Sequence, residues 1–145
     1  MFRSLNNLSK KIGESFPLDT ERGYHVMFNN HGLINRPVGW SQSGFYLVQL
    51  EEGLRAAGTV EIAGLSKPEN KKRIQMIESQ ARRLLPQLNE VKSTWLGFRP
   101  TLPDSLPVIG PSKKNKNIIY AFGHQHIGWT PVSYTHLTLP TNREV

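Results

Sequence analysis

Short runs of hydrophobic residues, several alternating with polar ones, mark the first part of the chain and predict β-strands. Four runs are predicted as strands: residues 18–28, 33–40, 44–50 and 54–62. The first breaks near Gly23, and the second contains Pro37, which suits an edge strand or a strand end. Residues 29–32 form a turn signal, and residues 51–53 predict a hairpin loop. Because these strands follow one another at short spacing, the pattern favours antiparallel hairpins.

Two other segments carry helical periodicity. Residues 1–13 place two leucines and an isoleucine at helical spacing and predict a short helix. A second, longer helix is predicted to begin at a capping box formed by Ser66 and Glu69 and to end at Pro86. Its apolar face repeats at steps of three and four: Ile74, Ile77, Ala81, Leu84 and Leu85. Its basic residues lie mostly on the other side: Lys71, Lys72, Arg73, Arg82 and Arg83.

The last third of the chain predicts two more strands, over residues 91–98 and 117–122. Between them lies a proline-rich connection, residues 100–111, with a short apolar piece at Val108 and Ile109. The sequence SKKNK that follows this connection is typical of a solvated hairpin turn. The whole pattern predicts an α+β fold, a largely antiparallel sheet with one long helix.

Composition and charge narrow the possible functions. The chain has no cysteine, which excludes thiol catalysis, cysteine-type zinc sites and iron–sulfur ligation. Its net charge of +7 raises the alternative of a small basic module that binds nucleic acid or an anionic surface. The basic residues are scattered and no aromatic residues interleave with them, which argues against a nucleic-acid partner. No G-x-G-x-x-G is present, so the sequence contains no dinucleotide-binding half.

A glycine-bounded segment, GHQHIG, follows the last predicted strand at residues 123–128. It lacks the Lys and Ser or Thr that would make it a phosphate-binding loop. His124 and His126 could share one face as metal ligands, but no third histidine or carboxylate lies nearby, and no metal site is predicted. The segment predicts a strand-to-helix turn, whose free N–H groups would suit an anionic or carbonyl-rich ligand. Taken alone, a plain turn is the simpler interpretation.

Arg99 stands at the end of a predicted strand among apolar neighbours. Its planar fork matches a carboxylate ligand, but it could equally form a surface ion pair with an acid such as Asp104, and the residues alone leave both open. Tyr24, His25 and Tyr46 lie on predicted strands, where each taken singly is more simply a packing residue.

Five segments together carry a resemblance to a known family. They are PLDTERGYHVMF (17–28), GFYLVQLEEGLRAAGTVEIAGL (44–65), ARRLLPQL (81–88), WLGFRPTLPDSLPVIGPS (95–112) and NIIYAFGHQHIGWT (117–130). The chain resembles the carboxyl-terminal part of the FAD-dependent D-amino acid dehydrogenases, which belong with glycine oxidase, sarcosine oxidase and D-amino acid oxidase. The likeness covers most of residues 9–130. It implies the substrate-domain part of such a flavoprotein, with a mixed, largely antiparallel sheet.

The resemblance also implies roles for individual residues. Arg99 matches the arginine that binds the substrate carboxylate, Tyr46 matches a tyrosine that lines the substrate site, and His126 takes a place where relatives carry a polar side chain toward the substrate. The positions that match the flavin-facing turn are Gly123, His124, Gln125, Ile127 and Gly128. The resemblance assigns no catalytic residue in the strict sense.

The activity implied is oxidation of a D-amino acid to an imino acid, which water converts to a 2-oxo acid and ammonia. FAD would be the cofactor, and a quinone or another respiratory acceptor would take the electrons. The resemblance implies a cytoplasmic protein and leaves room for peripheral association of the intact enzyme with the inner face of the bacterial plasma membrane.

The two ends depart from the family pattern. Residues 1–13 predict a partial helix left from a truncated N-terminal part, and residues 14–131 predict the substrate domain with its flavin-facing segment. From Val132 the sequence VSYTHLTLPT matches the conceptual translation of a transposon end used in sequencing libraries, so residues 132–145 are predicted to be a non-native tail. We therefore expect a fragment that is inactive alone and exposes apolar surface meant for the missing half.

Overall fold

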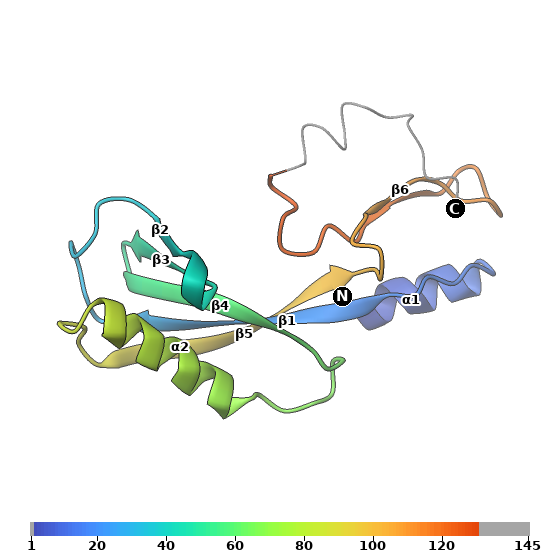
Figure 1. Cartoon of the computed structure of the whole chain (residues 1–145). Coiled ribbons are helices and arrows are strands. Elements are labelled where there is room, and N and C mark those ends of the chain that lie inside the picture. The colour runs from blue at the N-terminus through green and yellow to red at the C-terminus, as the bar shows by residue number, and fades with distance from the viewer. Residues whose placement is uncertain (1, 131–145) are drawn as a thin grey trace. The chain divides into compact units, whose positions relative to one another are not determined.

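A computed structural model of the chain describes residues 2–130 (Figure 1). The predicted tail at 132–145 lies outside the described residues. The described chain forms two compact units. Arg22–Phe98 form one, here called the sheet unit, and the described residues before Arg22 and after Phe98 form the other, here called the terminal unit. The elements in chain order are α1 (Phe2–Lys11), β1 (Asp19–Phe28), β2 (Val38–Trp40), the 3₁₀ turn η1 (Ser41–Ser43), β3 (Phe45–Leu50), β4 (Gly53–Ile62), α2 (Lys71–Leu84), β5 (Val91–Thr101), β6 (Val108–Pro111) and β7 (Ile119–Phe122).

A five-stranded sheet in the order β2-β3-β4-β1-β5 confirms the predicted strands of the first part of the chain. β3 pairs antiparallel with both β2 and β4, as the short spacing predicts. The expected edge strand is confirmed but short, because only Val38–Trp40, just after Pro37, is extended. Leu50 lies opposite Gly53, so the hairpin turn is two residues long. A Cβ at Gly53 would stand 2.3 Å from the Phe28 carbonyl oxygen, which leaves room only for glycine.

The predicted break in the first strand at Gly23 is wrong. β1 runs without interruption through Gly23 from Asp19 to Phe28. β1 lies between β4 and β5 in the sheet order, so neighbours on both sides can hold its backbone extended. Glycine weakens a strand interior, but here it does not interrupt the strand.

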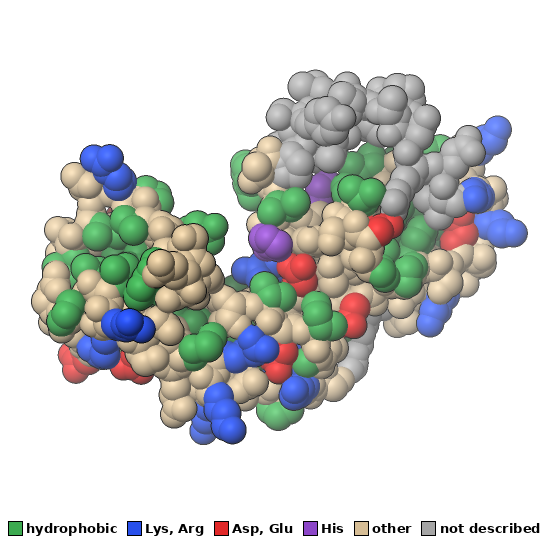
Figure 2. All heavy atoms as spheres, viewed as in Figure 1, with side chains coloured by type: hydrophobic (Ala, Val, Ile, Leu, Met, Phe, Trp, Pro, Cys, Tyr) green, Lys and Arg blue, Asp and Glu red, His purple; other side chains and the backbone are tan. Residues whose placement is uncertain are grey.

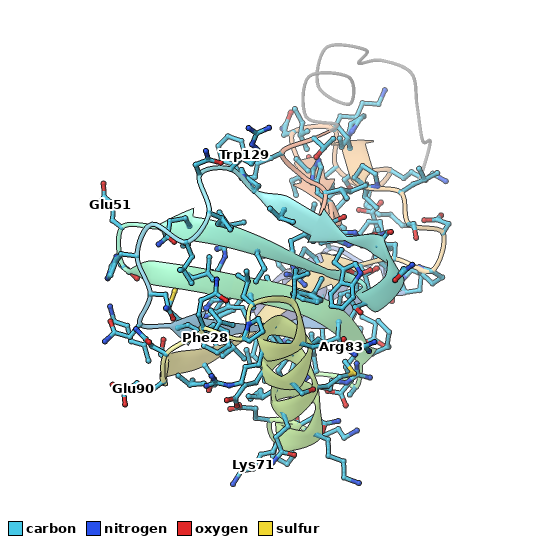
Figure 3. All side chains as sticks on the ribbon, turned by 60° about the vertical axis from the view of Figure 1, so that its left-hand side comes forward. Phe28, Glu51, Lys71, Arg83, Glu90 and Trp129 are labelled. Atoms are coloured by element: carbon cyan, nitrogen blue, oxygen red, sulfur yellow. The ribbon has the colours of Figure 1, made fainter. Side chains whose placement is uncertain are left out.

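Helix α2 lies against the sheet from Lys71, in its first turn, to Arg83, near its end (Figure 3). Ile77 and Ala81 are buried against the strands, and Ile74 and Leu85 pack beside them, which confirms most of the predicted apolar face. Leu84 is instead partly exposed. The buried residues of this core are Tyr24, Val26, Phe28, Phe45, Leu47, Leu54, Ala56, Ile77, Ala81 and Leu88.

The predicted capping box at Ser66 and Glu69 does not begin the helix. Asn70 is the N-cap, and its side chain accepts a hydrogen bond from the Lys72 N–H at 3.2 Å. Asn is as strong an N-cap as Ser. The preceding segment is tied down, because Lys67 Nζ lies 3.1 Å from Glu61 Oε1 and the Pro68 carbonyl accepts from Arg22 at 2.8 Å. These contacts keep residues 66–69 out of the helix.

The terminal unit has its own small core. The predicted helix of residues 1–13 is confirmed as α1, and the predicted hairpin around SKKNK is confirmed as the connection between antiparallel β6 and β7. The connection predicted over 100–111 is partly wrong, since β5 extends to Thr101 and Val108–Pro111 form a strand against β7. The buried residues of this core are Phe16, Leu102, Val108, Tyr120 and Phe122.

Glu14 joins the segment after α1 to the β6–β7 hairpin. Its Oε2 accepts hydrogen bonds from Ser112 Oγ at 2.5 Å and Tyr120 Oη at 2.6 Å, and Oε1 accepts from the Lys113 N–H at 2.9 Å. The bonds from Ser112 and Tyr120 lower the pKa of Glu14 below its ordinary value. The carboxylate is therefore held in its charged form as a link within the terminal unit.

Candidate functional site

Residues 123–130 follow β7 as a series of turns. The expectation that this segment opens a helix is not met within residues 123–130, and His124 and His126 lie in the turn instead of on a strand. Two residues here adopt left-handed backbone conformations, Gly123 at φ +88° and Gln125 at φ +54°. A Cβ at Gly123 would stand 2.6 Å from Leu102 Cδ1, so the close approach of the turn to the terminal core depends on glycine.

The turn offers polar groups without partners of their own. The Gln125 N–H donates to the Pro100 carbonyl at 3.0 Å, which fixes the turn to the end of β5. Across the part of the chain that is described, the N–H groups of Gly123, His126 and Gly128 donate no hydrogen bond, and the buried Gln125 Nε2 has no partner. Free N–H groups gathered in one turn suit an anion or a carbonyl-rich ligand.

Arg99 lies in β5 directly before Pro100, whose carbonyl holds this turn. Its side chain is half-buried, and no ion pair or hydrogen bond joins it to any residue within 2–130. The alternative pairing with Asp104 is therefore not formed, and Asp104 Oδ1 accepts instead from the Leu106 N–H at 3.0 Å. A guanidinium placed in this way can bind a carboxylate ligand through two parallel hydrogen bonds.

His126 contacts a carboxylate from the other end of the sequence. Its Nδ1 lies 2.9 Å from Glu21 Oε2, and the side chain of Glu21 is only 13% exposed whereas that of His126 is 51% exposed. Arg99, His126 and the turn thus belong to one unit, and the Gln125–Pro100 bond links them. Sequence reasoning missed Glu21, because 105 residues separate it from His126 and no local motif marks the pair.

Tyr46 belongs to the sheet unit. It lies on β3 between the buried Phe45 and Leu47 and is itself 64% exposed. Its ring covers Gly39 on the neighbouring strand, where a Cβ would stand 2.8 Å from Tyr46 Cε1. Tyr46 is therefore not a core residue, and its phenol is free to meet a ligand.

Tyr24 and His25, the other two aromatic candidates, both contact other side chains of the sheet unit. Tyr24 is buried and donates to Glu61 Oε2 at 2.7 Å, while its oxygen accepts from the Asn70 N–H. His25 stacks on Trp95 with ring centroids 5.1 Å apart. Burial lowers the pKa of His25 below its ordinary value, and the charge of Arg55 lowers it further.

Sequence reasoning also missed a buried polar network around Glu61. Tyr24, Lys67 and Asn70 donate to its carboxylate, and the fully buried Arg22 has its Nε 3.7 Å from Glu61 Oε2. The Tyr24 hydrogen bond, followed by those from Lys67 and Asn70, lowers the pKa of Glu61 from 4.5 to about 2. The network joins β1, β4 and the start of α2, which gives it a structural role.

Within residues 2–130, no group of three histidine or acidic side chains could hold a metal ion. No helix in the same range is both long enough and apolar enough to span a membrane.

Comparison with known proteins shows the family of the chain and its relatives. The family model described as FAD dependent oxidoreductase matches residues 4–135. A D-amino-acid oxidase from Bradyrhizobium diazoefficiens is 41% identical over 128 residues, which cover 83% of this chain and 30% of that protein. A D-amino acid dehydrogenase from Paramagnetospirillum magneticum is 32% identical over 128 residues, covering 85% of this chain and 30% of the relative. The chain thus spans about a third of the length of the curated relatives it matches.

Two solved structures share the fold. A glycine oxidase from Geobacillus kaustophilus superposes with a TM-score of 0.70 at 22% identity, over 83% of this chain and 34% of that one. An L-proline dehydrogenase from P. horikoshii gives a TM-score of 0.73 at 21% identity, over 88% and 36%. The mostly antiparallel sheet with few helices is therefore the fold found in these flavoproteins.

Proposed function

The chain belongs to the FAD dependent oxidoreductase family, and from this premise we propose that it supplies the substrate domain of an enzyme that oxidises D-amino acids. The products would be 2-oxo acids and ammonia. The names of the curated relatives support this substrate class. The substrate domain is proposed over residues 14–131, with the helix of residues 1–13 belonging to a preceding part and residues 132–145 a non-native tail.

The observation that supports the proposal most directly is the position and the free guanidinium of Arg99 within the described residues. A half-buried guanidinium without a partner among the described residues stands at the end of β5, beside a turn that is rich in free donors. Every amino acid carries a carboxylate, and a bidentate arginine contact fixes both its position and its orientation. Arg99 would thereby hold the reacting Cα–H in place against the cofactor. Tyr46 and His126 are each proposed, from the family resemblance, to contact the substrate.

The residues of the turn fit FAD. The free N–H groups of Gly123, His126 and Gly128 and the unpartnered Gln125 Nε2 are all donors, and the flavin ring system presents carbonyl oxygens. Gly123 brings the backbone into a conformation that a side chain would obstruct. Gly123, His124, Gln125, Ile127 and Gly128 are therefore proposed to contact the flavin. Bound FAD would supply the two-electron acceptor for the oxidation.

We propose that the reduced enzyme passes its electrons to a quinone. This acceptor would place the enzyme at the inner face of the plasma membrane. The 145-residue chain is proposed to be inactive alone, because its sequence holds no G-x-G-x-x-G to bind the cofactor pyrophosphate. The activity is thus proposed for a protein that combines this chain with a dinucleotide-binding half.

The rival function, a basic binding module, would need its positive charges on one continuous face. Figure 2 shows the Lys and Arg side chains at separate places over the face in view, with hydrophobic and uncharged side chains between them. The face in view therefore carries no continuous basic surface.

A chimera tests the proposed function. The 128-residue segment of this chain replaces its counterpart in the Bradyrhizobium diazoefficiens D-amino-acid oxidase, and oxidation of D-amino acids is assayed with oxygen and with a quinone analogue. Activity is expected, and Arg99→Gln should lower kcat/KM about 10- to 150-fold, as loss of a charged hydrogen bond of about 1.5–3 kcal/mol implies. Arg36→Gln, at an exposed loop arginine, is the matched control. A chimera that binds FAD but oxidises no D-amino acid would overturn the proposal.

A further inference from the structure

We infer that Glu21 and His126 form a dyad in which Glu21 positions the imidazole as the proton acceptor for the substrate's ammonium group. This inference rests on the proposed function and adds to it a proton-transfer step and a positioning residue. It starts from the 2.9 Å contact between His126 Nδ1 and Glu21 Oε2.

The contact decides which ring nitrogen is basic. An ionised carboxylate can only accept a hydrogen bond, so His126 must donate through Nδ1 and carry its proton there. The lone pair of the neutral ring then lies on Nε2, which has no hydrogen-bond partner within residues 2–130. Since the His126 side chain is 51% exposed, Nε2 remains accessible to a ligand.

Both partners are held in place. Glu21 stands on β1 with a mostly buried side chain, so its carboxylate has little freedom. His126 follows Gln125, whose left-handed backbone is fixed by the hydrogen bond to the Pro100 carbonyl. A non-glycine residue held in that conformation is a form of local strain often found at functional sites. The ring of His126 and the backbone before it are therefore both anchored.

The position suits the chemistry. The bond to Pro100 ties the turn to the residue that follows Arg99, the proposed carboxylate ligand. In an α-amino acid the ammonium group is attached to the same carbon as the carboxylate. Glu21 of β1, Arg99 of β5 and His124 of the same turn all belong to the terminal unit that holds the imidazole. Of these Glu21 is in direct contact and would stabilise the imidazolium.

In the proposed step, the substrate's ammonium group first loses a proton to His126. An amino acid with a protonated nitrogen cannot lose hydride from Cα, because no lone pair is available to form the C=N bond. His126 Nε2 takes one proton from the ammonium, which gives the neutral amine and an imidazolium beside Glu21. Once the amine is neutral, its nitrogen lone pair can form the C=N bond, and bound FAD would supply the two-electron acceptor that takes the Cα hydrogen as hydride. Water afterwards releases ammonia and the 2-oxo acid.

The first test uses the full 145-residue chain and needs no activity. Nitrogen NMR of ¹⁵N-histidine-labelled protein at mildly alkaline pH reports the tautomer of each of the five histidines, and His126→Asn identifies the signal. Neutral His126 is expected as the Nδ1–H tautomer. Glu21→Gln retains an acceptor oxygen and should keep this tautomer, whereas Glu21→Ala should give a mixture. Glu51→Ala, at the exposed β3–β4 hairpin, is the control (Figure 3). An Nε2–H tautomer in the parent chain, or no change in Glu21→Ala, would overturn the dyad.

The second test uses the chimera. His126→Asn should lower kcat/KM at pH 7 by about 10²–10⁴-fold, and the deficit should shrink at high pH, where solution supplies the neutral amine. Glu21→Ala should cause a smaller loss, and the double variant should equal His126→Asn, because Glu21 acts only through His126. A loss that is independent of pH, or losses that add, would overturn the inference. If the chimera oxidises no D-amino acid at any pH while the tautomer result holds, the proposed function fails and the dyad stands.

Discussion

Gly97 of β5 leaves space for the indole ring of Trp95, which lies on the same strand. A Cβ at Gly97 would stand 1.9 Å from Trp95 Cη2, so the indole occupies the place of a side chain. The same indole stacks on His25 with 19° between the planes. The pKa of His25 is lowered by burial first and by Arg55 second. Gly97 thus leaves room for the ring that stacks on His25, and we expect a side chain at Gly97 to disturb the surroundings of that histidine.

Gly97→Ala should displace the Trp95 ring, because the ring can rotate whereas the strand cannot move. His25 would lose its cover, and its pKa should rise toward 6.5. NMR titration of His25 measures this shift, and near-UV circular dichroism reports the movement of Trp95. Thr94→Ala, at an exposed position of the same strand, is the control and should change neither signal. An unchanged His25 titration in Gly97→Ala would contradict the coupling.

Glu61 predicts how the sheet unit responds to acid. Its pKa falls from 4.5 to about 2 in the folded chain, with the Tyr24 hydrogen bond as the largest cause. A lowered carboxylate pKa adds stability above pH 4.5 that is lost as the pH falls from 4.5 toward 2. Glu61→Gln should therefore lower stability at neutral pH and flatten its dependence on pH in that window. Denaturation followed by tryptophan fluorescence at several pH values measures this, with exposed Glu90→Gln as control. Parallel pH profiles for Glu61→Gln and the parent chain would rule out this role.

At the scale of the element, the start of α2 depends on Asn70. Asn70→Ala removes the acceptor for the Lys72 N–H and should destabilise the chain by about 1 kcal/mol. Asn70→Ser keeps an acceptor for the Lys72 N–H without placing a second carboxylate beside Glu61, and it should cost less. Glu69→Ala tests the capping box expected from sequence, and should have little effect because Glu69 is exposed and precedes the helix. Urea denaturation of the three variants gives the comparison. A larger loss in Glu69→Ala than in Asn70→Ala would favour the capping box.

The elements that sequence reasoning placed well are those defined by their own residues. The hairpin of β3 and β4 has hydrophobic strands on both sides of a two-residue turn, and α2 has an apolar face and a proline after its end. The elements it misplaced depend on distant partners. Val108–Pro111 is a strand because it pairs with β7, and β1 is continuous because other strands flank Gly23.

The same distinction applies to the candidate site. Arg99 and the 123–128 turn stand out through their residue types and resemblance, so they could be proposed from the sequence. The partner of His126 could not, because Glu21 is an ordinary charged residue of a strand and meets the histidine only after folding. The Glu61 network likewise brings Arg22 and Tyr24 of β1 together with Glu61 and Asn70, which lie much later in the sequence.

At the scale of the whole molecule, each unit has its own core and its own exposed apolar side chains. In the sheet unit these include Tyr46, Ile62 and Trp95, and in the terminal unit Ile119 and Ile127. Among the described residues, exposed apolar side chains are therefore found in both units. Apolar side chains at the surface suit contact with a further protein segment or a ligand, as proposed for a chain that works together with a dinucleotide-binding half.

Under the proposed function, FAD binding is divided between this chain and a dinucleotide-binding half. The turn at 123–128 offers donors for the ring system, but the sequence holds no G-x-G-x-x-G for the pyrophosphate. The 145-residue chain should therefore bind FAD weakly and no better than riboflavin, which lacks the phosphates. The chimera should bind FAD far more tightly than riboflavin. Quenching of flavin fluorescence during titration measures the affinities of the chain and of the chimera for FAD and for riboflavin. Gly123→Ala in the chimera tests whether the turn contributes to FAD binding. If the 145-residue chain purified yellow with stoichiometric FAD, its own residues would have to bind the pyrophosphate. The proposal that a separate half binds the pyrophosphate would then be wrong.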